Sequence, residues 1–215
     1  MGRYCFLSVL LMLISLHTLA ATADFDQQLL SIQQRWAHIN YEIPEPQREK
    51  AFEQLAAAAE RLIQAHPNRA EPLIWKGIVV STWAGARGGL GALGLVKEAR
   101  GLFERSLRID PQALAGSAYT SLGSLYYQVP GWPIAFGDDK KAREMLEQAV
   151  KIDPAGIDSN YFYGDYWLEE GDYRKAKVYF DKAMQAAPRA DRPLADEGRR
   201  REILAKLEIV AKKLH

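Results

Sequence analysis

Apolar residues recur at helical spacing in paired segments of this chain, and residues 157–188 show the pattern most clearly. Between the two segments lies Glu170–Gly171–Asp172, which is a turn signal. Pro188 ends the unit, because proline cannot continue a helix. The pattern predicts two antiparallel helices that meet through small or bulky side chains. These side chains are Tyr163, Gly164, Trp167, Ala176, Phe180 and Ala183.

The same spacing occurs twice more upstream, with a small residue at the corresponding place of each helix. Helices that pack about 8–10 Å apart need small residues where they cross, so each glycine is expected to face an alanine of the following helix. The expected pairs are Gly77 with Ala99, Gly123 with Ala142, and Gly164 with Ala176.

This pattern resembles the tetratricopeptide repeat, a helical hairpin with a period of about 34 residues and a closing proline. Pro154 and Pro188 lie 34 residues apart, whereas Pro111 and Pro154 lie 43 apart. The longer copies carry inserts between their helices: a glycine-rich segment (residues 85–94), predicted to be a flexible tip, and a second insert (residues 128–139). The resemblance implies an all-α fold, a right-handed α-solenoid of about four antiparallel helix pairs plus a C-terminal capping helix.

The flanking segments complete the domain organisation. Apolar residues at helical spacing predict a helix over residues 24–40 and another over 46–66, which we interpret as a degenerate first repeat. A last helix, from Pro193 to Leu214, combines an apolar stripe with charged residues, as expected of a helix that caps a solenoid. We therefore assign residues 24–193 to the repeat domain and residues 194–215 to the capping helix.

Residues 1–23 have the features of a secretory signal peptide. Arg3 precedes an apolar core from Phe6 to Leu16, and Ala21–Thr22–Ala23 provides a small-residue cleavage site. The core falls short of the roughly 20 residues that a membrane span needs. We expect cleavage after Ala23, a periplasmic or secreted protein and no stable membrane span. Retention of the leader as an anchor is the alternative.

Composition and motifs argue against catalysis and nucleic-acid binding. The 28 basic residues balance 27 acidic ones, so no global field attracts a polyanion. The single cysteine, Cys5, lies in the leader, which leaves the mature chain without a thiol nucleophile or a thiolate metal site. The glycine-rich segment lacks the Lys-Ser/Thr ending of a phosphate loop, and no serine-hydrolase or metal-helix motif is present. We expect no enzyme, no cofactor and no metal. A hydrolase that acts on envelope polymers is the least favoured alternative.

Candidate binding residues lie beside the packing positions of the first helices and in the second insert. In a helical-repeat protein those positions line a concave surface, and apolar side chains in an insert are too costly to leave solvated without a role. The set has no basic clamp for a carboxylate, which favours an apolar ligand or peptide over an acidic one. The candidates are Ile74, Ile78, Trp83, Thr120, Ser124, Tyr127, Trp132, Ile134, Phe136, Tyr161 and Asp165.

A more specific resemblance involves the second insert. The run Leu122-Gly-Ser-Leu-Tyr-Tyr-Gln-Val-Pro-Gly-Trp-Pro-Ile-Ala-Phe-Gly-Asp-Asp-Lys-Lys-Ala142, followed by Asn160-Tyr-Phe-Tyr-Gly164, is similar to the TatT family of periplasmic tetratricopeptide proteins associated with TRAP-type transporters. The resemblance implies a ligand cavity and a role beside a periplasmic solute-binding protein for hydrophobic solutes. Lipoprotein members need a cysteine at the cleavage site, and this sequence has none there.

Two hypotheses follow. The first is a non-catalytic exported module that binds a protein partner, a small apolar ligand, or both. The second is a scaffold for cell-envelope or secretion-system assembly that uses its concave face and holds no small ligand. The exposed apolar inserts also favour a homo-oligomer.

Overall fold

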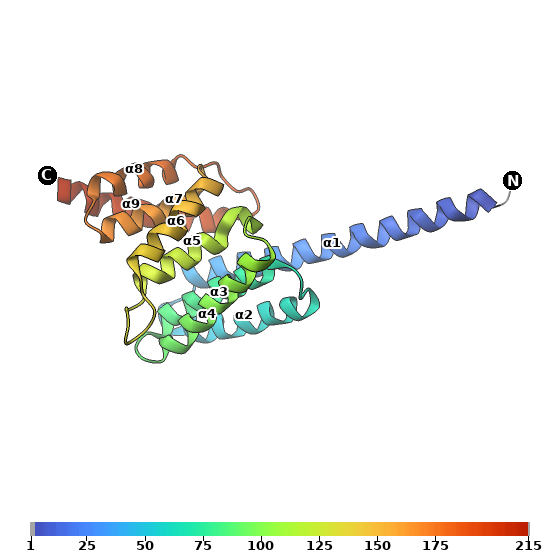
Figure 1. The fold of residues 1–215 in the computed structure, drawn as a ribbon, viewed down its shortest axis with the longest axis horizontal. Helices are drawn as coiled ribbons and strands as arrows, with labels where there is room; N and C mark the ends of the chain where they lie inside the picture. Colours follow the sequence, from blue (N-terminus) through green and yellow to red (C-terminus); the bar gives the residue numbers. More distant parts are fainter. Residues whose placement is uncertain (1–2, 215) are drawn as a thin grey trace.

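The computed structural model describes the backbone of residues 3–214 and the side chains of residues 22–214. This part of the chain forms nine helices and no strand, which confirms the predicted all-α helical-repeat class (Figure 1). The helices are α1 (Arg3–Tyr41), α2 (Glu45–Ala65), α3 (Ala70–Arg87), α4 (Ala92–Ile109), α5 (Ala113–Gln128), α6 (Asp139–Ile152), α7 (Ile157–Glu169), α8 (Tyr173–Met184) and α9 (Pro193–Leu214).

Consecutive helices pack as four antiparallel hairpins, followed by α9 (Figure 1). The first helices of successive hairpins also pack on one another, α1 on α3, α3 on α5 and α5 on α7, and α9 continues this row by packing on α7. Each second helix lies between its own partner and the first helix of the next hairpin. The odd-numbered helices therefore form an inner row, and the site described below is built from it.

The glycines that repeat along the sequence have other neighbours than the predicted glycine–alanine pairs. A Cβ atom on Gly77 would lie 2.5 Å from the ring of Phe103, and one on Gly164 would lie 2.8 Å from the ring of Phe180. The corresponding neighbour of Gly123 is Leu146, with the carbonyl oxygen of Ala142 next to it. The glycines thus make room for a large side chain one turn beyond the alanine, and the fully buried alanines let the helices come close.

The row of inner helices closes on itself, because α9 also packs on α1. Gly198 lies directly against the ring of Tyr41, where a Cβ atom would overlap the ring carbons. The amide of Gln34 donates a hydrogen bond of 3.0 Å to the carbonyl oxygen of Asp191 in the segment before α9. The predicted capping helix therefore covers the end of the repeats and also joins them to their beginning.

The two inserts have different structures. Helix α3 continues to Arg87 and α4 begins at Ala92, so the flexible tip predicted for residues 85–94 is wrong for most of its length. Buried Ala84 and Leu95 hold the ends of both helices in the core, and the turn needs only residues 88–91, where Gly88 and Gly89 have positive φ angles of 65° and 59°. The second insert is a true loop, closed by a hydrogen bond of 2.9 Å from the Gly137 amide to the Pro130 carbonyl oxygen.

The N-terminal prediction can be compared with the structure only in part. The predicted signal peptide, residues 1–23, lies outside the residues whose side chains are described, apart from Thr22 and Ala23. The helix predicted for residues 24–40 is the second half of α1. No helix in the described residues is both long enough and apolar enough to cross a membrane.

Candidate functional site

A cavity of about 660 Å³ lies inside the closed row of inner helices. This volume falls within the range of about 300–1,000 Å³ that is typical of small-molecule sites. Its walls come from α1, α2, α3, α4, α5, α7 and α9, and from the segment that leads into α9. The exposed residues that line it mark its mouth. They lie at the start of α2 (Glu45), at the end of α3 and in the turn after it (Gly85, Ala86 and Gly89), and at the start of the second insert (Gln128 and Pro130).

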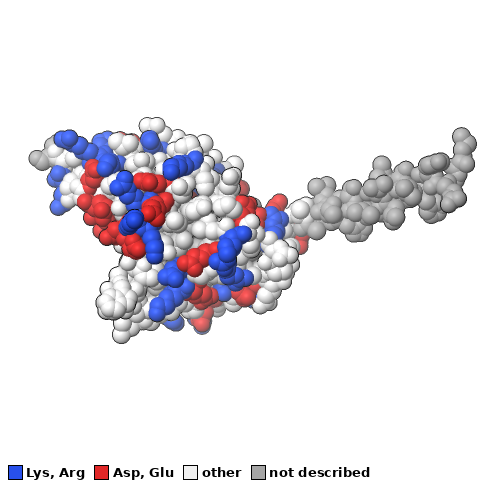
Figure 2. Space-filling view, viewed as in Figure 1, with Lys and Arg blue, Asp and Glu red and all other residues white. Residues whose placement is uncertain are grey.

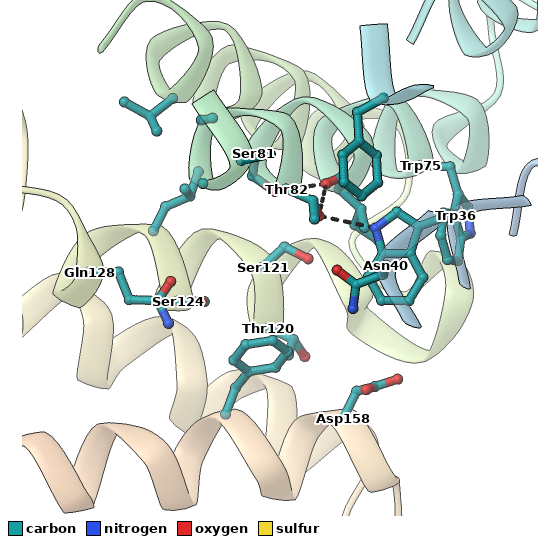
Figure 3. A pocket seen from close by; sticks show the side chains of 18 of the residues that line it. Trp36, Asn40, Trp75, Ser81, Thr82, Thr120, Ser121, Ser124, Gln128 and Asp158 are labelled. Atoms are coloured by element: carbon teal, nitrogen blue, oxygen red, sulfur yellow. Dashed lines mark hydrogen bonds between the residues drawn. The ribbon is translucent and has the colours of Figure 1, made fainter. Parts of the chain in front are cut away.

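Aromatic and aliphatic side chains form much of the wall. Trp36 of α1 and Trp75 of α3 meet edge to face, with ring centroids 6.1 Å apart. The indole Nε1 of Trp36 donates a hydrogen bond of 3.0 Å to the hydroxyl of Thr82, which fixes the ring (Figure 3). The other large apolar lining residues are Phe52, Ile78, Val96, Leu125 and Phe162.

Hydroxyl groups on α5 face the same space and have no protein partner. The hydroxyl of Thr82 donates to the carbonyl oxygen of Ile78 at 2.8 Å, so its own proton is used within the helix. In contrast, the hydroxyls of Thr120, Ser121 and Ser124 form no hydrogen bond with another described residue, although Thr120 and Ser124 are buried. Because buried polar groups usually have partners, these hydroxyls are available to a ligand or to water in the cavity.

One end of the cavity is charged. Asp158 of α7 accepts hydrogen bonds from Nη1 of Arg189 at 2.8 Å and from Nε of Arg199 at 2.9 Å. Burial alone would raise the pKa of Asp158, but the two guanidinium groups hold it well below its usual value. The carboxylate is therefore ionised and links α7 to α9 and to the segment before α9.

Arg192 lies in the same segment and is the exception among these arginines. Its guanidinium carbon lies 4.9 Å from the ring centroid of Trp75, over the indole. Its buried Nε has no hydrogen-bond partner among the described residues. Burial, reinforced by the positive charge of Arg189, lowers the pKa of Arg192 from its usual value.

Three of the predicted site residues, Ile78, Thr120 and Ser124, line the cavity. Ile74 and Tyr161 do not line it, because both are buried in the core between helices. Trp83 is also absent from the cavity wall; it is half-buried beneath the guanidinium group of Arg87, 5.1 Å from its ring. On α3 and α7 the cavity is lined by Trp75 and Phe162, each one position after a predicted residue. The sequence offset used for the prediction therefore identified only part of the lining.

Tyr127 and Asp165 form a separate polar cluster outside the cavity. The Tyr127 hydroxyl donates a hydrogen bond of 2.8 Å to one carboxylate oxygen of Asp165, and Nζ of Lys206 lies 2.7 Å from the other. Burial, with the adjacent Asp165 charge, raises the pKa of Tyr127. The cluster joins α5, α7 and α9 across the inner row, which is a structural role for residues that were predicted to bind a ligand.

The second insert places its apolar residues on the surface. Trp132 is 89% exposed and Ile134 is 58% exposed. Phe136 is half-buried, with its ring 5.8 Å from that of Tyr126 and the guanidinium group of Arg100 4.8 Å above it. Phe136 thus anchors the insert, and Trp132 and Ile134 remain exposed to solvent.

Basic and acidic side chains are interleaved over the face shown in Figure 2, as the balanced composition predicts. Within the described residues, no group of three or more His, Cys, Asp or Glu side chains could hold a metal ion.

Several cavity residues were not predicted from the sequence. Trp36 belongs to the first hairpin, which was interpreted as a degenerate repeat, and Arg189, Arg192 and Arg199 belong to a segment interpreted as a polar linker and a cap. The predicted set contained no basic clamp, whereas these three arginines line the cavity. Three arginines within 11 residues after the closing Pro188 were the available signal.

Comparison with known proteins supports the repeat architecture. A family model described as Tetratricopeptide repeat matches residues 134–155 and 157–189. Residues 157–189 are therefore similar to a tetratricopeptide repeat. They comprise α7 and α8, the hairpin with the clearest pattern in the sequence, and the other match covers α6. No curated protein matches the sequence.

Solved structures with a similar arrangement include MamA, at 21% identity over 80% of this chain and 95% of that chain, with a TM-score of 0.44. A tetratricopeptide protein of Thermus thermophilus, TTC0263, shares 18% identity over 83% of this chain and 98% of its own, with a TM-score of 0.40. PilF of Pseudomonas aeruginosa shares 15% identity over 89% and 94%, with a TM-score of 0.35. The likeness to these three proteins is one of helical architecture.

Proposed function

We propose that this protein is a non-catalytic, exported binding module that encloses a small, largely apolar molecule in the cavity of its inner helices. The observation that carries the proposal is the closure of α9 onto α1 around a cavity of about 660 Å³. Aromatic walls and a few unpaired hydroxyls are the composition expected of a small-molecule site.

The closure favours a small molecule over an extended peptide as the ligand. Open helical-repeat proteins bind peptides along a continuous concave groove. Here the contact of Gly198 with Tyr41 joins the two ends of that groove, and the interior is reached at the mouth beside Gly89 and Pro130. A ligand that fits has to pass the mouth and lie between the helices.

The resemblance of the second insert to the TatT family supports a more specific role. We propose that the protein works in the periplasm beside a TRAP-type transporter and contacts its solute-binding protein through Trp132 and Ile134. The insert begins at Gln128 and Pro130, which line the cavity. A partner docked on the insert would therefore hold its own binding site next to the mouth, which suits the transfer of an apolar solute that is poorly soluble in water.

The second candidate function is a scaffold for cell-envelope or secretion-system assembly without a small ligand. Tetratricopeptide repeats mediate protein–protein interaction. The exposure of Trp132 favours this function as much as the first, because an isolated exposed tryptophan fits a protein contact. The two candidates differ in whether the cavity is used.

Native mass spectrometry of the purified protein, with calorimetric titration of 1-octanol, separates them. We expect the wild-type protein to bind 1-octanol or to retain a small molecule, and Ser121→Trp, which fills the cavity without removing a protein hydrogen bond, to do neither. Ser31→Trp, at an exposed position of α1, is the matched control and should behave as wild type. An empty wild-type protein that binds no 1-octanol would reject the cavity as the site and leave the scaffold function.

A further inference from the structure

One of the arginines around the cavity has no direct partner. Four arginines line it, and the lining carboxylates are Asp158 and the exposed Glu45. Asp158 is held by Arg189 and Arg199, which have second partners in Asp196 and Glu202. Arg48 donates to the carbonyl oxygen of Ile43. The fourth of the lining arginines is Arg192.

Arg192 forms neither an ion pair nor a side-chain hydrogen bond with any described residue, and its Nε is buried without a partner. The carboxylates of Asp158, Asp196 and Asp191 act on it only at longer range, and burial outweighs them. A guanidinium group cannot discharge by losing its proton, because its pKa stays above about 12 in proteins. The group is a permanent cation that lacks an anion.

The position of Arg192 leaves it able to take one. The guanidinium carbon lies 4.9 Å from the Trp75 ring centroid, and no described residue occupies the N–H donors through an ion pair or a side-chain hydrogen bond, so they remain for an acceptor. A carboxylate matches two of those donors at once, and this paired geometry gives charge-assisted hydrogen bonds that are stronger than neutral ones. An ammonium or another cation would be repelled there.

Aliphatic residues also line the cavity, away from this charged end. Figure 3 shows Asp158 and Trp36 toward one end of the cavity and Gln128 toward the other, with Ser121 between them. Leu125 and Val129 flank Gln128 in the sequence and line the cavity with Leu93 and Val96. A ligand with a polar head and an aliphatic chain would satisfy both ends.

We infer that the cavity binds an anionic amphiphile, a carboxylate with an aliphatic chain, whose head group pairs with Arg192 over Trp75 and whose chain runs past Ser121 toward Leu125 and Val96. This inference rests on the proposed function and names the class of its ligand. It differs from the sequence-based expectation, which favoured an apolar ligand or peptide over an acidic one.

Calorimetric titration with octanoate and with 1-octanol tests the inference, because the two probes share a chain and differ in the charge of the head group. We expect octanoate to bind the wild-type protein about 10- to 100-fold more tightly, as is usual for a hydrogen bond to a charged group. Arg192→Gln should abolish that preference while changing 1-octanol affinity by less than about 3-fold. Arg61→Gln, at an exposed position of α2 outside the cavity, is the control and should leave both affinities unchanged.

The outcomes are distinguishable. Equal binding of the two probes by the wild-type protein would overturn the anionic ligand and leave the proposed function standing, whereas binding of neither would overturn both. A preference for octanoate that survives in Arg192→Gln would overturn the assignment to Arg192. If Arg192→Gln does not fold, the wild-type comparison still decides the charge of the ligand, and octyltrimethylammonium, which should not bind, gives the opposite-charge check.

Discussion

Gly198 provides the most direct test of the closed row of helices. The residue lies within α9 against the ring of Tyr41, and an added Cβ atom would overlap the ring carbons. Tyr41 cannot turn away easily, because it is packed against Trp36 at a centroid distance of 5.9 Å. Its burial also raises the pKa of its hydroxyl to about 12. We therefore expect Gly198→Ala to strain the contact between the two ends of the repeat row.

The size of the effect follows from a matched substitution. Gly101 is also a glycine inside a helix, α4, but a Cβ atom there would meet nothing within 4 Å. Replacing a helical glycine with alanine stabilises by about 0.5–1 kcal/mol through the backbone, and both variants share this gain. Overpacking a filled contact costs about 1–3 kcal/mol, and only Gly198→Ala incurs it. The difference between the two variants should therefore be about 1–3 kcal/mol.

Urea denaturation followed by circular dichroism at 222 nm measures the free energy of unfolding of both variants. Gly101→Ala should raise it, and Gly198→Ala should fall below Gly101→Ala by the amount given above. Gly198→Ala should also weaken 1-octanol binding, because the cavity loses its closure. Equal stability of the two variants would show that α9 does not press on α1, and the enclosed cavity would have to be abandoned.

Three further predictions concern other parts of the fold. Asp158→Asn should lower the free energy of unfolding by about 2–4 kcal/mol at pH 7, less than the roughly 3–5 kcal/mol for breaking a fully buried pair, because the carboxylate is 33% exposed. The pKa of Asp158 is depressed in the folded protein, so its contribution to stability is present above the unfolded value near about 3.9 and is lost as pH falls through the folded value. The free energy of unfolding of the variant should therefore depend less on pH in the acid range than that of the wild type. Gly171→Ala should cost about 1–2 kcal/mol in the same urea experiment, because the residue has a φ of 76°. An added Cβ atom would meet no neighbour within 4 Å, so the loss is backbone strain alone, and Gly171→Asn should cost less. Trp132→Ala should change the free energy of unfolding by less than about 0.5 kcal/mol, whereas Phe136→Ala should lower it by more because the Phe136 ring packs on Tyr126. Equal melting temperatures for the two variants would contradict the different burial of these residues.

The sequence predicts the hairpins well because their packing is local and repeated. The bounds of α9 agree with the predicted helix from Pro193 to Leu214, and Tyr126, Tyr163 and Trp167 are buried as expected. The Asp138 side chain accepts a hydrogen bond of 3.0 Å from the Lys141 amide and so caps the start of α6, where an aspartate is a favoured residue. Each of these features depends on residues a few positions apart, so the spacing of side chains is enough to indicate it.

The cavity could not be predicted in the same way because its parts are distant in the sequence. The hydrogen bond from Gln34 to Asp191 joins residues 157 positions apart, and no periodic pattern encodes such a contact. The arginines that make one end polar lie after the closing Pro188, outside any repeat. The pairing of Gly77 with Phe103 was missed for a different reason, since the spacing shows that a small residue is needed but not which neighbour fills the space.

Closure explains why a short helical-repeat protein has a partly buried and unpaired cation. In an open solenoid, Arg192 would face solvent, and water would satisfy its guanidinium group. Packing of α9 on α1 brings the segment before α9 over Trp75, where the group loses part of its hydration. Removing a charge from water costs free energy unless an opposite charge replaces the lost hydration. The folded protein therefore holds a position that an anion would stabilise, and the contact of α9 with α1 accounts for both the cavity and the preference for an anion that we propose.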